Sequence, residues 1–200
     1  MANNPKSETD VMAQVEKQLH HDEPEMQHIA LTRLIDRVVA MIGEAFSWLW
    51  LVLLTVIIGN VILRYVFSQG MIELEELQWY LYATAWLCGM SYTFVYDGHV
   101  RVDVIHENLR FKTKMWLELF GLVLLFLPFV YFVLTYALAF VQLSWETGET
   151  STSANGLGAR WLVKGALTFS FLLLFLVGLS RLIRVTLTLK RGPAAPAGAQ

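Results

Sequence analysis

The sequence predicts an all-α integral membrane protein with four transmembrane helices. Of its 200 residues, 56% are hydrophobic and only 16% are charged, whereas a soluble domain carries about 25% charged residues. The apolar residues are gathered into long runs, and each run is long enough to cross a hydrocarbon core of about 30 Å. None of these runs alternates apolar and polar residues as a transmembrane barrel strand does.

The four predicted spans cover residues 38–63, 74–96, 115–143 and 161–187, inside a membrane domain of residues 26–190. Residues 1–25 are polar and acidic, and residues 191–200 are rich in Pro, Ala and Gly, so both segments are predicted to be tails. The first tail lacks the early apolar core of a secretory signal peptide. The first hydrophobic helix is therefore expected to be an uncleaved anchor.

The segment before the first span has two interpretations. Apolar residues recur at helical spacing from Met26 to Val38, while Arg33 and Arg37 lie on another face. This pattern is typical of an amphipathic helix lying on the membrane surface. It is equally typical of a simple extension of the first span, and the sequence does not separate the two.

Two further segments carry local signals. Pro128 near the middle of the third span predicts a kink, because proline removes a backbone hydrogen bond from a helix. The segment 144–160 is rich in Thr, Ser and Gly, which predicts a flexible surface loop.

One face of the second span is polar or small along its whole length. Its residues alternate in spacing between three and four, which keeps them on one side of a helix: Glu75, Gln78, Tyr82, Ala85, Gly89, Tyr92 and Tyr96. In lipid, small and hydroxyl-bearing residues favour helix–helix contact. The stripe is therefore predicted to pack against protein, and that protein is either the chain's own bundle or another subunit.

Polar residues gather where the first two spans meet. Asn60 and Arg64 share a face at the end of the first span, and Glu75 and Glu76 begin the second span after a short connection. An antiparallel turn would bring Arg64 close to both carboxylates. A partly buried contact of this kind would hold the two helices together.

The opposite end of the second span carries His99, Arg101 and Asp103, which are predicted to form a local polar network at the membrane surface. The alternative is a plain basic anchor without a specific partner. Most basic residues of the chain lie on this side: Lys6, Lys17, Arg33, Arg37, Arg101, Arg110, Lys112, Lys114, Arg181, Arg184, Lys190 and Arg191. The other side has only Arg64, Arg160 and Lys164. The positive-inside rule therefore places both termini in the cytoplasm.

The sequence shows no catalytic signature. It contains no phosphate-binding loop, nucleophile elbow, metal-binding helix pair or dinucleotide fingerprint, so no enzyme activity, cofactor, metal or nucleic acid is expected. A secondary carrier needs polar groups near the bilayer midplane. The spans are apolar at that depth, around Leu54, Trp86, Leu127 and Phe171, which favours an accessory subunit. The alternative is a self-assembling small channel or exporter built of identical four-helix units, with the stripe as its only candidate lining.

Several segments together resemble one family. They are NVILRYVF, then ELEELQWYLYATAWLCGMSYTFVYDGHVRVDVI, then SWETGE followed by GLGARWLVK. In this order they are similar to the small membrane subunit of the tripartite ATP-independent periplasmic (TRAP) transporters, a DctQ-like family. The resemblance covers roughly residues 35–187, and the segment from Glu75 to Asp103 carries most of it.

The resemblance implies a four-helix subunit of the bacterial inner membrane, surrounded by lipids and paired with a large TRAP membrane subunit. In that family the large subunit moves substrate and sodium ions, and a periplasmic solute-binding protein delivers the solute, here expected to be a small organic acid-type compound. The small subunit is thought to scaffold the large one and to help dock the binding protein. No catalytic residue carries over. The candidate subunit-interface or structural residues are Asn60, Arg64, Glu75, Glu76, Gln78, Tyr82, Gly89, Tyr92, His99, Arg101 and Asp103.

Overall fold

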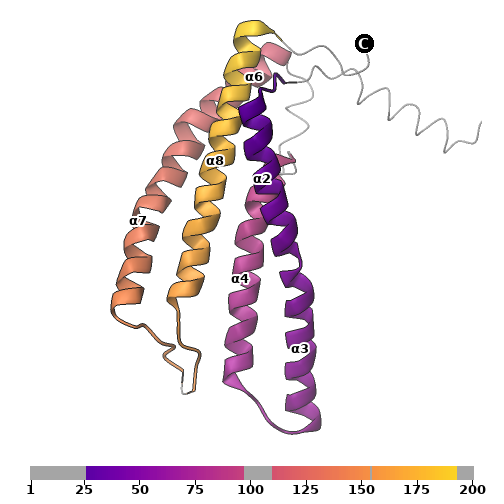
Figure 1. The fold of residues 1–200 in the computed structure, drawn as a ribbon, viewed down its shortest axis with the longest axis vertical. Coiled ribbons are helices and arrows are strands. Elements are labelled where there is room, and N and C mark those ends of the chain that lie inside the picture. The colour runs from indigo at the N-terminus through magenta and orange to yellow at the C-terminus, as the bar shows by residue number, and fades with distance from the viewer. Residues whose placement is uncertain (1–25, 97–109, 154, 193–200) are drawn as a thin grey trace, which may run out of the picture.

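The structure, a computed structural model, describes residues 26–96, 110–153 and 155–192, and every regular element in these ranges is a helix (Figure 1). The elements are α2 (Ala30–Ser47), α3 (Leu49–Val66), α4 (Ile72–Val95), α6 (Phe111–Phe120), η1 (Gly121–Phe126), α7 (Leu127–Glu146) and α8 (Trp161–Arg191). The prediction of an all-α fold is confirmed for the described residues.

Three helical stretches in the described part of the chain are long and apolar enough to cross a membrane. They are Ala30–Val66, Phe111–Glu146 and Trp161–Arg191. The helix α4 has 24 residues, but its uncharged part contains Gln, Tyr and Trp residues that are less apolar than Leu or Ile. Length and composition therefore support three spans directly.

The first stretch consists of α2 and α3, which meet at a single break at Trp48. The helix α2 runs through Val38 without interruption, so residues 30–37 are continuous with residues 38–47 and form no separate surface helix. At its start the Thr32 hydroxyl accepts a hydrogen bond from the Ile29 N–H and donates one to the Ile29 carbonyl. The structure thus shows no break in the helix at residue 38, the predicted start of the first span.

The middle stretch contains a π-helical segment, η1, directly before Pro128. The Leu127 N–H donates to the Leu122 carbonyl, five residues earlier. Proline has no N–H, and its ring would clash with the carbonyl four residues earlier in a regular α-helix. Widening the preceding turn relieves this conflict, so the irregularity predicted at Pro128 takes the form of a π-helical segment.

The helix α8 lies at the centre and packs on α2, α4, α6, η1 and α7. The helices α3 and α7 lie on opposite flanks, with α3 packed on α4 and α7 packed on α8 (Figure 1). Each flanking helix buries one narrow line with seven-residue spacing, Leu53 and Asn60 on α3 and Val130, Ala137 and Ser144 on α7. Their remaining apolar residues are largely exposed, as expected where the surroundings are lipid or another membrane protein.

The two ends of the bundle differ in packing. We name the two ends after the orientation that the sequence predicts. The end with the start of α2, the helix α6 and the last turns of α8 is called the inner end, and the end with the α3–α4 connection and the loop between α7 and α8 is called the outer end. Two apolar clusters lie toward the inner end, and their buried members are Val39, Leu173 and Val177 in one and Met115, Leu122 and Val185 in the other. Phe94 and Phe126 stack there with ring centroids 4.7 Å apart. The bundle is therefore held together mainly at its inner end.

Candidate functional site

At the outer end the structure joins α3 to α4 through a charged contact. Arg64 Nη1 donates to Glu75 Oε1 at 3.2 Å. The side chains are 59% and 47% exposed, so the pair is a surface contact and not the partly buried one that the sequence suggested. An exposed pair contributes about 0–1 kcal/mol. It aligns the two helices without locking them.

Glu76 points elsewhere and organises the loop between α7 and α8. Its carboxylate accepts hydrogen bonds from the Ser151 hydroxyl and, at 2.6 Å, from the Leu157 N–H. The Ser151 N–H in turn donates to the Leu157 carbonyl at 3.1 Å. The two neighbouring glutamates thus have different partners, which the sequence did not distinguish.

A second carboxylate ties the same loop to the start of α8. Lys164 donates to Glu149, and Arg160 lies 3.6 Å from it. The hydrogen bond from Lys164 is the chief reason that the pKa of Glu149 lies below its usual range. The described residues of this loop are therefore joined to α4 through Glu76 and to the start of α8 through Glu149.

Part of the stripe on α4 contacts α2 and α3 of the same chain. The Tyr82 ring packs edge-on against Trp50 at 5.8 Å between centroids. Gly43 of α2 lies so close to Tyr92 that an added Cβ would be 2.6 Å from the Tyr92 Cβ. Gly89 differs, because nothing lies within 4 Å of the position of a Cβ there.

Two predicted polar residues lie one turn inward from the Arg64–Glu75 contact. Asn60 on α3 and Gln78 on α4 each carry a buried side-chain atom, Oδ1 and Nε2 respectively, without a hydrogen-bond partner. One is an acceptor and the other a donor, so they are complementary in type. The remaining predicted site residues, His99, Arg101 and Asp103, lie outside the described residues.

The most deeply buried charges lie at the inner end, and sequence reasoning missed them. Arg181, whose side chain is 1% exposed, donates to Glu118 of α6. Arg184 lies 3.6 Å from Asp36 of α2, which also accepts a 2.8 Å hydrogen bond from the Ser180 hydroxyl. Arg181, Arg184 and Glu118 take part in further interactions as well. These contacts join α2, α6 and α8.

The spacing of residues along α8 could have indicated that both arginines lie on its buried face. Ser170, Leu174, Val177, Arg181, Arg184 and Thr188 alternate in spacing between four and three, and all of them are buried. The two arginines were counted only as basic anchors on one side of the membrane. Their place on the buried face of the helix indicates instead that they need internal acidic partners.

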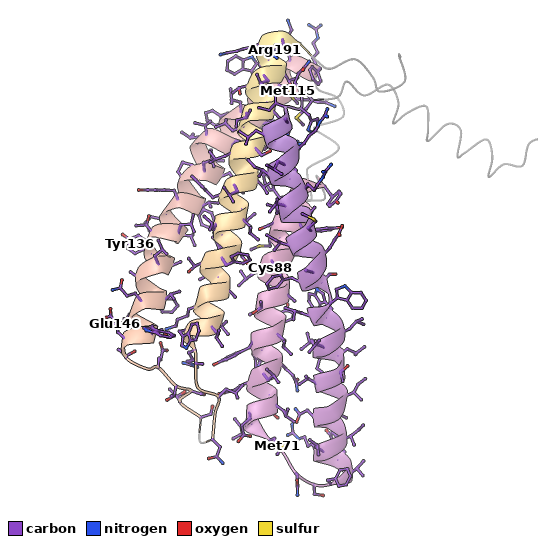
Figure 2. The ribbon with its side chains drawn as sticks, in the orientation of Figure 1. Met71, Cys88, Met115, Tyr136, Glu146 and Arg191 are labelled. Atoms are coloured by element: carbon purple, nitrogen blue, oxygen red, sulfur yellow. The ribbon has the colours of Figure 1, made fainter. Side chains whose placement is uncertain are left out.

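Near the middle of the bundle the polar side chains satisfy one another. Cys88 Sγ and Ser170 Oγ are 3.3 Å apart, and the Ser91 hydroxyl donates to the Ser170 carbonyl at 3.1 Å. All three residues are fully buried between α4 and α8, and Figure 2 marks Cys88 at mid-length. These groups connect α4 to α8 and are not exposed.

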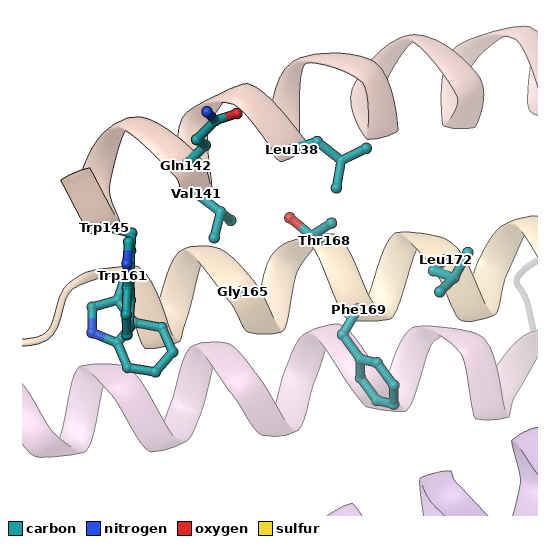
Figure 3. A pocket seen from close by; sticks show the side chains of 9 residues that line it. All are labelled: Leu138, Val141, Gln142, Trp145, Trp161, Gly165, Thr168, Phe169 and Leu172. Carbon is teal, nitrogen blue, oxygen red and sulfur yellow. The ribbon is translucent and has the colours of Figure 1, made fainter.

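Two open apolar grooves flank the seam between α7 and α8. One, of about 620 Å³, is lined among others by Leu138, Trp145, Trp161 and Phe169 (Figure 3). The other, of about 500 Å³, lies on the opposite side of α7 and is lined by residues that include Phe132, Tyr136, Phe140 and Leu167. The Trp145 and Trp161 rings meet edge-on at 4.7 Å at the outer end of the first groove. Tryptophan is typical of the membrane interface.

Within the described residues, no group of three or more His, Cys, Asp or Glu side chains could hold a metal ion. The charged clusters pair acids with bases and connect helices. These features define a helical, multi-pass membrane protein whose polar residues serve assembly.

The family follows from a comparison with known families. Residues 53–188 match the model of the "Tripartite ATP-independent periplasmic transporters, DctQ component". The chain belongs to this family and is a small membrane subunit of a TRAP transporter, a protein of the inner membrane. The family is a transporter component, which in general associates with a large membrane subunit and a binding protein. No curated protein matches the chain.

Proposed function

We propose that this chain is the scaffold of a TRAP transporter and that solute does not pass through it. It holds the large, sodium-coupled subunit in the membrane and offers part of the outer surface on which a solute-binding protein docks. The transported solute is a small organic acid-type compound. Residues 26–190 form the membrane domain that does this.

One observation carries the proposal: the buried polar groups at mid-depth are engaged in helix–helix contacts. Moving a charged solute through hydrocarbon requires groups that replace its hydration. Here Ser170 contacts both Cys88 and Ser91. The grooves beside α7 are apolar and open to the surroundings of the bundle. The described residues thus offer packing surfaces where a carrier would need a polar path.

The proposal includes four crossings, with α4 as the fourth. The helix α4 follows α3 after a short connection and packs on both α3 and α8. It therefore returns the chain from the outer end toward α6 at the inner end, and its 24 residues are enough for about 30 Å. The distribution of basic residues places the inner end and both termini in the cytoplasm.

Docking of the binding protein is assigned to the outer end. The described loop residues, 147–153 and 155–160, are held there by contacts with Glu76 and Glu149. A preformed surface loses less conformational entropy when a partner binds. Arg64 and Glu75 flank this surface and remain exposed.

Reconstitution into liposomes tests the proposal. Uptake under a sodium gradient should require the large subunit, the binding protein and this chain together, and this chain alone should give neither uptake nor conductance. Conductance by the chain alone would favour the self-assembling channel. Full uptake and stability of the large subunit without this chain would disprove the scaffold role.

A further inference from the structure

The inference concerns which face of the chain meets the large subunit, and it rests on the proposed function. The exposed faces of α3 and α7 differ in composition. On α3 the exposed residues within the span are mainly aliphatic and include Leu54, Ile58 and Ile62, whereas on α7 they include Phe129, Phe132, Tyr136 and Phe140. Aliphatic side chains need nothing from their surroundings except apolar contact, which lipid tails supply.

The helix α7 exposes two tyrosines, Tyr131 and Tyr136, whose hydroxyls lipid does not suit, and Tyr136 is the one that lies on the aromatic face. Its side chain is 63% exposed on α7 (Figure 2). With Trp145 and Trp161 at the interface, Tyr136 lies nine residues before Trp145, which is about 14 Å of helix and close to the middle of a core of about 30 Å. This midpoint is nine residues nearer the outer end than Leu127, the midpoint expected from the predicted span. The structure gives the Tyr136 hydroxyl no hydrogen-bond partner among the described residues. A hydroxyl left unpaired in hydrocarbon costs free energy.

Other hydroxyls along the helices show how the chain otherwise avoids this cost. Thr55, Thr84, Thr93, Thr135 and Thr168 each donate to the carbonyl four residues earlier in their own helix. A tyrosine hydroxyl stands too far from its own backbone to do so. Tyr82, nearer the outer end, can lean toward the interface because side chains tilt toward the helix N-terminus. Tyr136 lies at mid-depth, so its hydroxyl reaches neither a carbonyl of its own helix nor the membrane interface.

The surface around Tyr136 is shaped to receive a helix. The Phe132 and Tyr136 rings lie 4.6 Å apart between centroids, and both line the groove of about 500 Å³ that Leu167 of α8 closes on its other side. Lys164 Nζ lies 3.7 Å above the centre of the Phe140 ring and fixes it in place. Aromatic rings offer a large contact area that loses little rotamer freedom on binding.

We propose that this face of α7, formed by Phe129, Phe132, Tyr136 and Phe140, binds a transmembrane helix of the large TRAP subunit. The Tyr136 hydroxyl donates a hydrogen bond to that helix at mid-membrane. The aliphatic face of α3 is covered by lipid. The contact surface thus lies on the flank opposite to α3, and not on the α4 stripe, part of which contacts α2 and α3.

Photo-cross-linking in the co-expressed complex tests this assignment. The photoreactive amino acid p-benzoylphenylalanine replaces Tyr136 in one variant and Ile58, which is 50% exposed on α3, in the control. The expected result is a cross-link to the large subunit from position 136 and none from position 58. A cross-link only from position 58, a cross-link from position 136 to a second copy of this chain, or none from either position in an intact complex would overturn the assignment.

A second measurement tests what the Tyr136 hydroxyl alone contributes to the stability of the complex. Tyr136→Phe should weaken the solubilised complex about threefold, the effect of one interhelical hydrogen bond in a membrane, while Ile58→Ala should leave its dissociation constant unchanged. An unchanged dissociation constant for Tyr136→Phe would refute the hydrogen bond. If the unmodified chain does not co-purify with the large subunit at all, the proposed scaffold function fails, which is a different result from a misplaced interface.

Discussion

The inner and outer ends of this bundle use the same pairs of residue types in different environments. At the inner end Arg181 and Glu118 are buried and connect α8 to α6. At the outer end Arg64 and Glu75 connect α3 to α4 but remain about half exposed. Water and headgroups screen the outer pair, whereas at the inner end the surrounding protein leaves each charge dependent on its partner. Burial, more than residue type, therefore decides which contact holds the fold.

The largest expected effect comes from breaking the buried pair. Arg181→Ala should lower the free energy of unfolding by about 3–5 kcal/mol, because it removes one member of a buried ion pair and with it the guanidinium that faces Glu118. Arg64→Ala should cost less than about 1 kcal/mol. Both variants are unfolded in detergent with increasing fractions of SDS. The loss of helical circular dichroism then gives the free energy of unfolding of each variant.

A paired substitution provides the control for this test. Arg181→Met together with Glu118→Leu removes both charges and should recover part of the loss, because well-packed apolar residues often replace a buried pair without cost. If Arg64→Ala destabilised the protein as much as Arg181→Ala does, burial would not be the deciding difference between the two ends.

Two glycines sharpen the comparison between contacts inside the chain and open surface. An added Cβ at Gly43 would lie 2.6 Å from Tyr92 Cβ, whereas at Gly89 nothing lies within 4 Å. Gly43→Ala should therefore cost about 1–3 kcal/mol of stability through overpacking. Gly89→Ala should be neutral or stabilise the isolated chain by up to about 1 kcal/mol through helix propensity. The same SDS titration measures both, and equal effects would mean that α2 does not approach α4 as closely as the structure shows.

The helical fold could be predicted from the sequence because long apolar runs leave few alternatives. The local form of the helices was harder to predict. The irregularity at Pro128 was foreseen, but its spread over the six residues of η1 was not. The continuous α2 was one of two open interpretations, since amphipathic spacing looks the same in a surface helix and in an extended span.

Most of the contacts between helices could not be predicted from the sequence. Arg64 was expected near both Glu75 and Glu76, yet only Glu75 pairs with it, because consecutive residues on a helix point about 100° apart. Glu76 instead meets Ser151 and Leu157, which are more than 70 residues away in the chain. The partners of Arg181 and Arg184 were missed for the same reason: pairing across helices depends on helix order and rotation, which periodicity alone does not give.

A smaller effect is expected from separating the two neighbouring glutamates. Glu76→Ala should speed backbone amide hydrogen exchange at Leu157 about tenfold, because the N–H loses its carboxylate acceptor. Glu75→Ala should leave exchange in residues 147–160 unchanged, since its partner is Arg64 on α3. Exchange measured by mass spectrometry on peptides of this loop distinguishes the two. Equal acceleration by both variants would show that the loop depends on the α3–α4 connection as a whole.

The smallest effect concerns pH at the outer end. The pKa of Glu149 is lowered from its ordinary value near 4.5, chiefly by the hydrogen bond from Lys164. A carboxyl group whose pKa is lowered by folding adds stability that is fully present above its ordinary pKa and is lost as the pH falls through the folded value.

A spin label at the exposed position Thr150 should therefore be restrained at pH 6 and gain mobility only below about pH 4.5. Glu149→Gln should raise the mobility at pH 6 and reduce the step, while Glu76, whose pKa is also lowered, chiefly by the hydrogen bond from Ser151, still holds the loop. A step above pH 4.5, or a step of undiminished size in Glu149→Gln, would show that Glu149 does not control the loop. The same label placed on the last turn of α8, at the exposed Lys190, serves as the reference for the bundle as a whole.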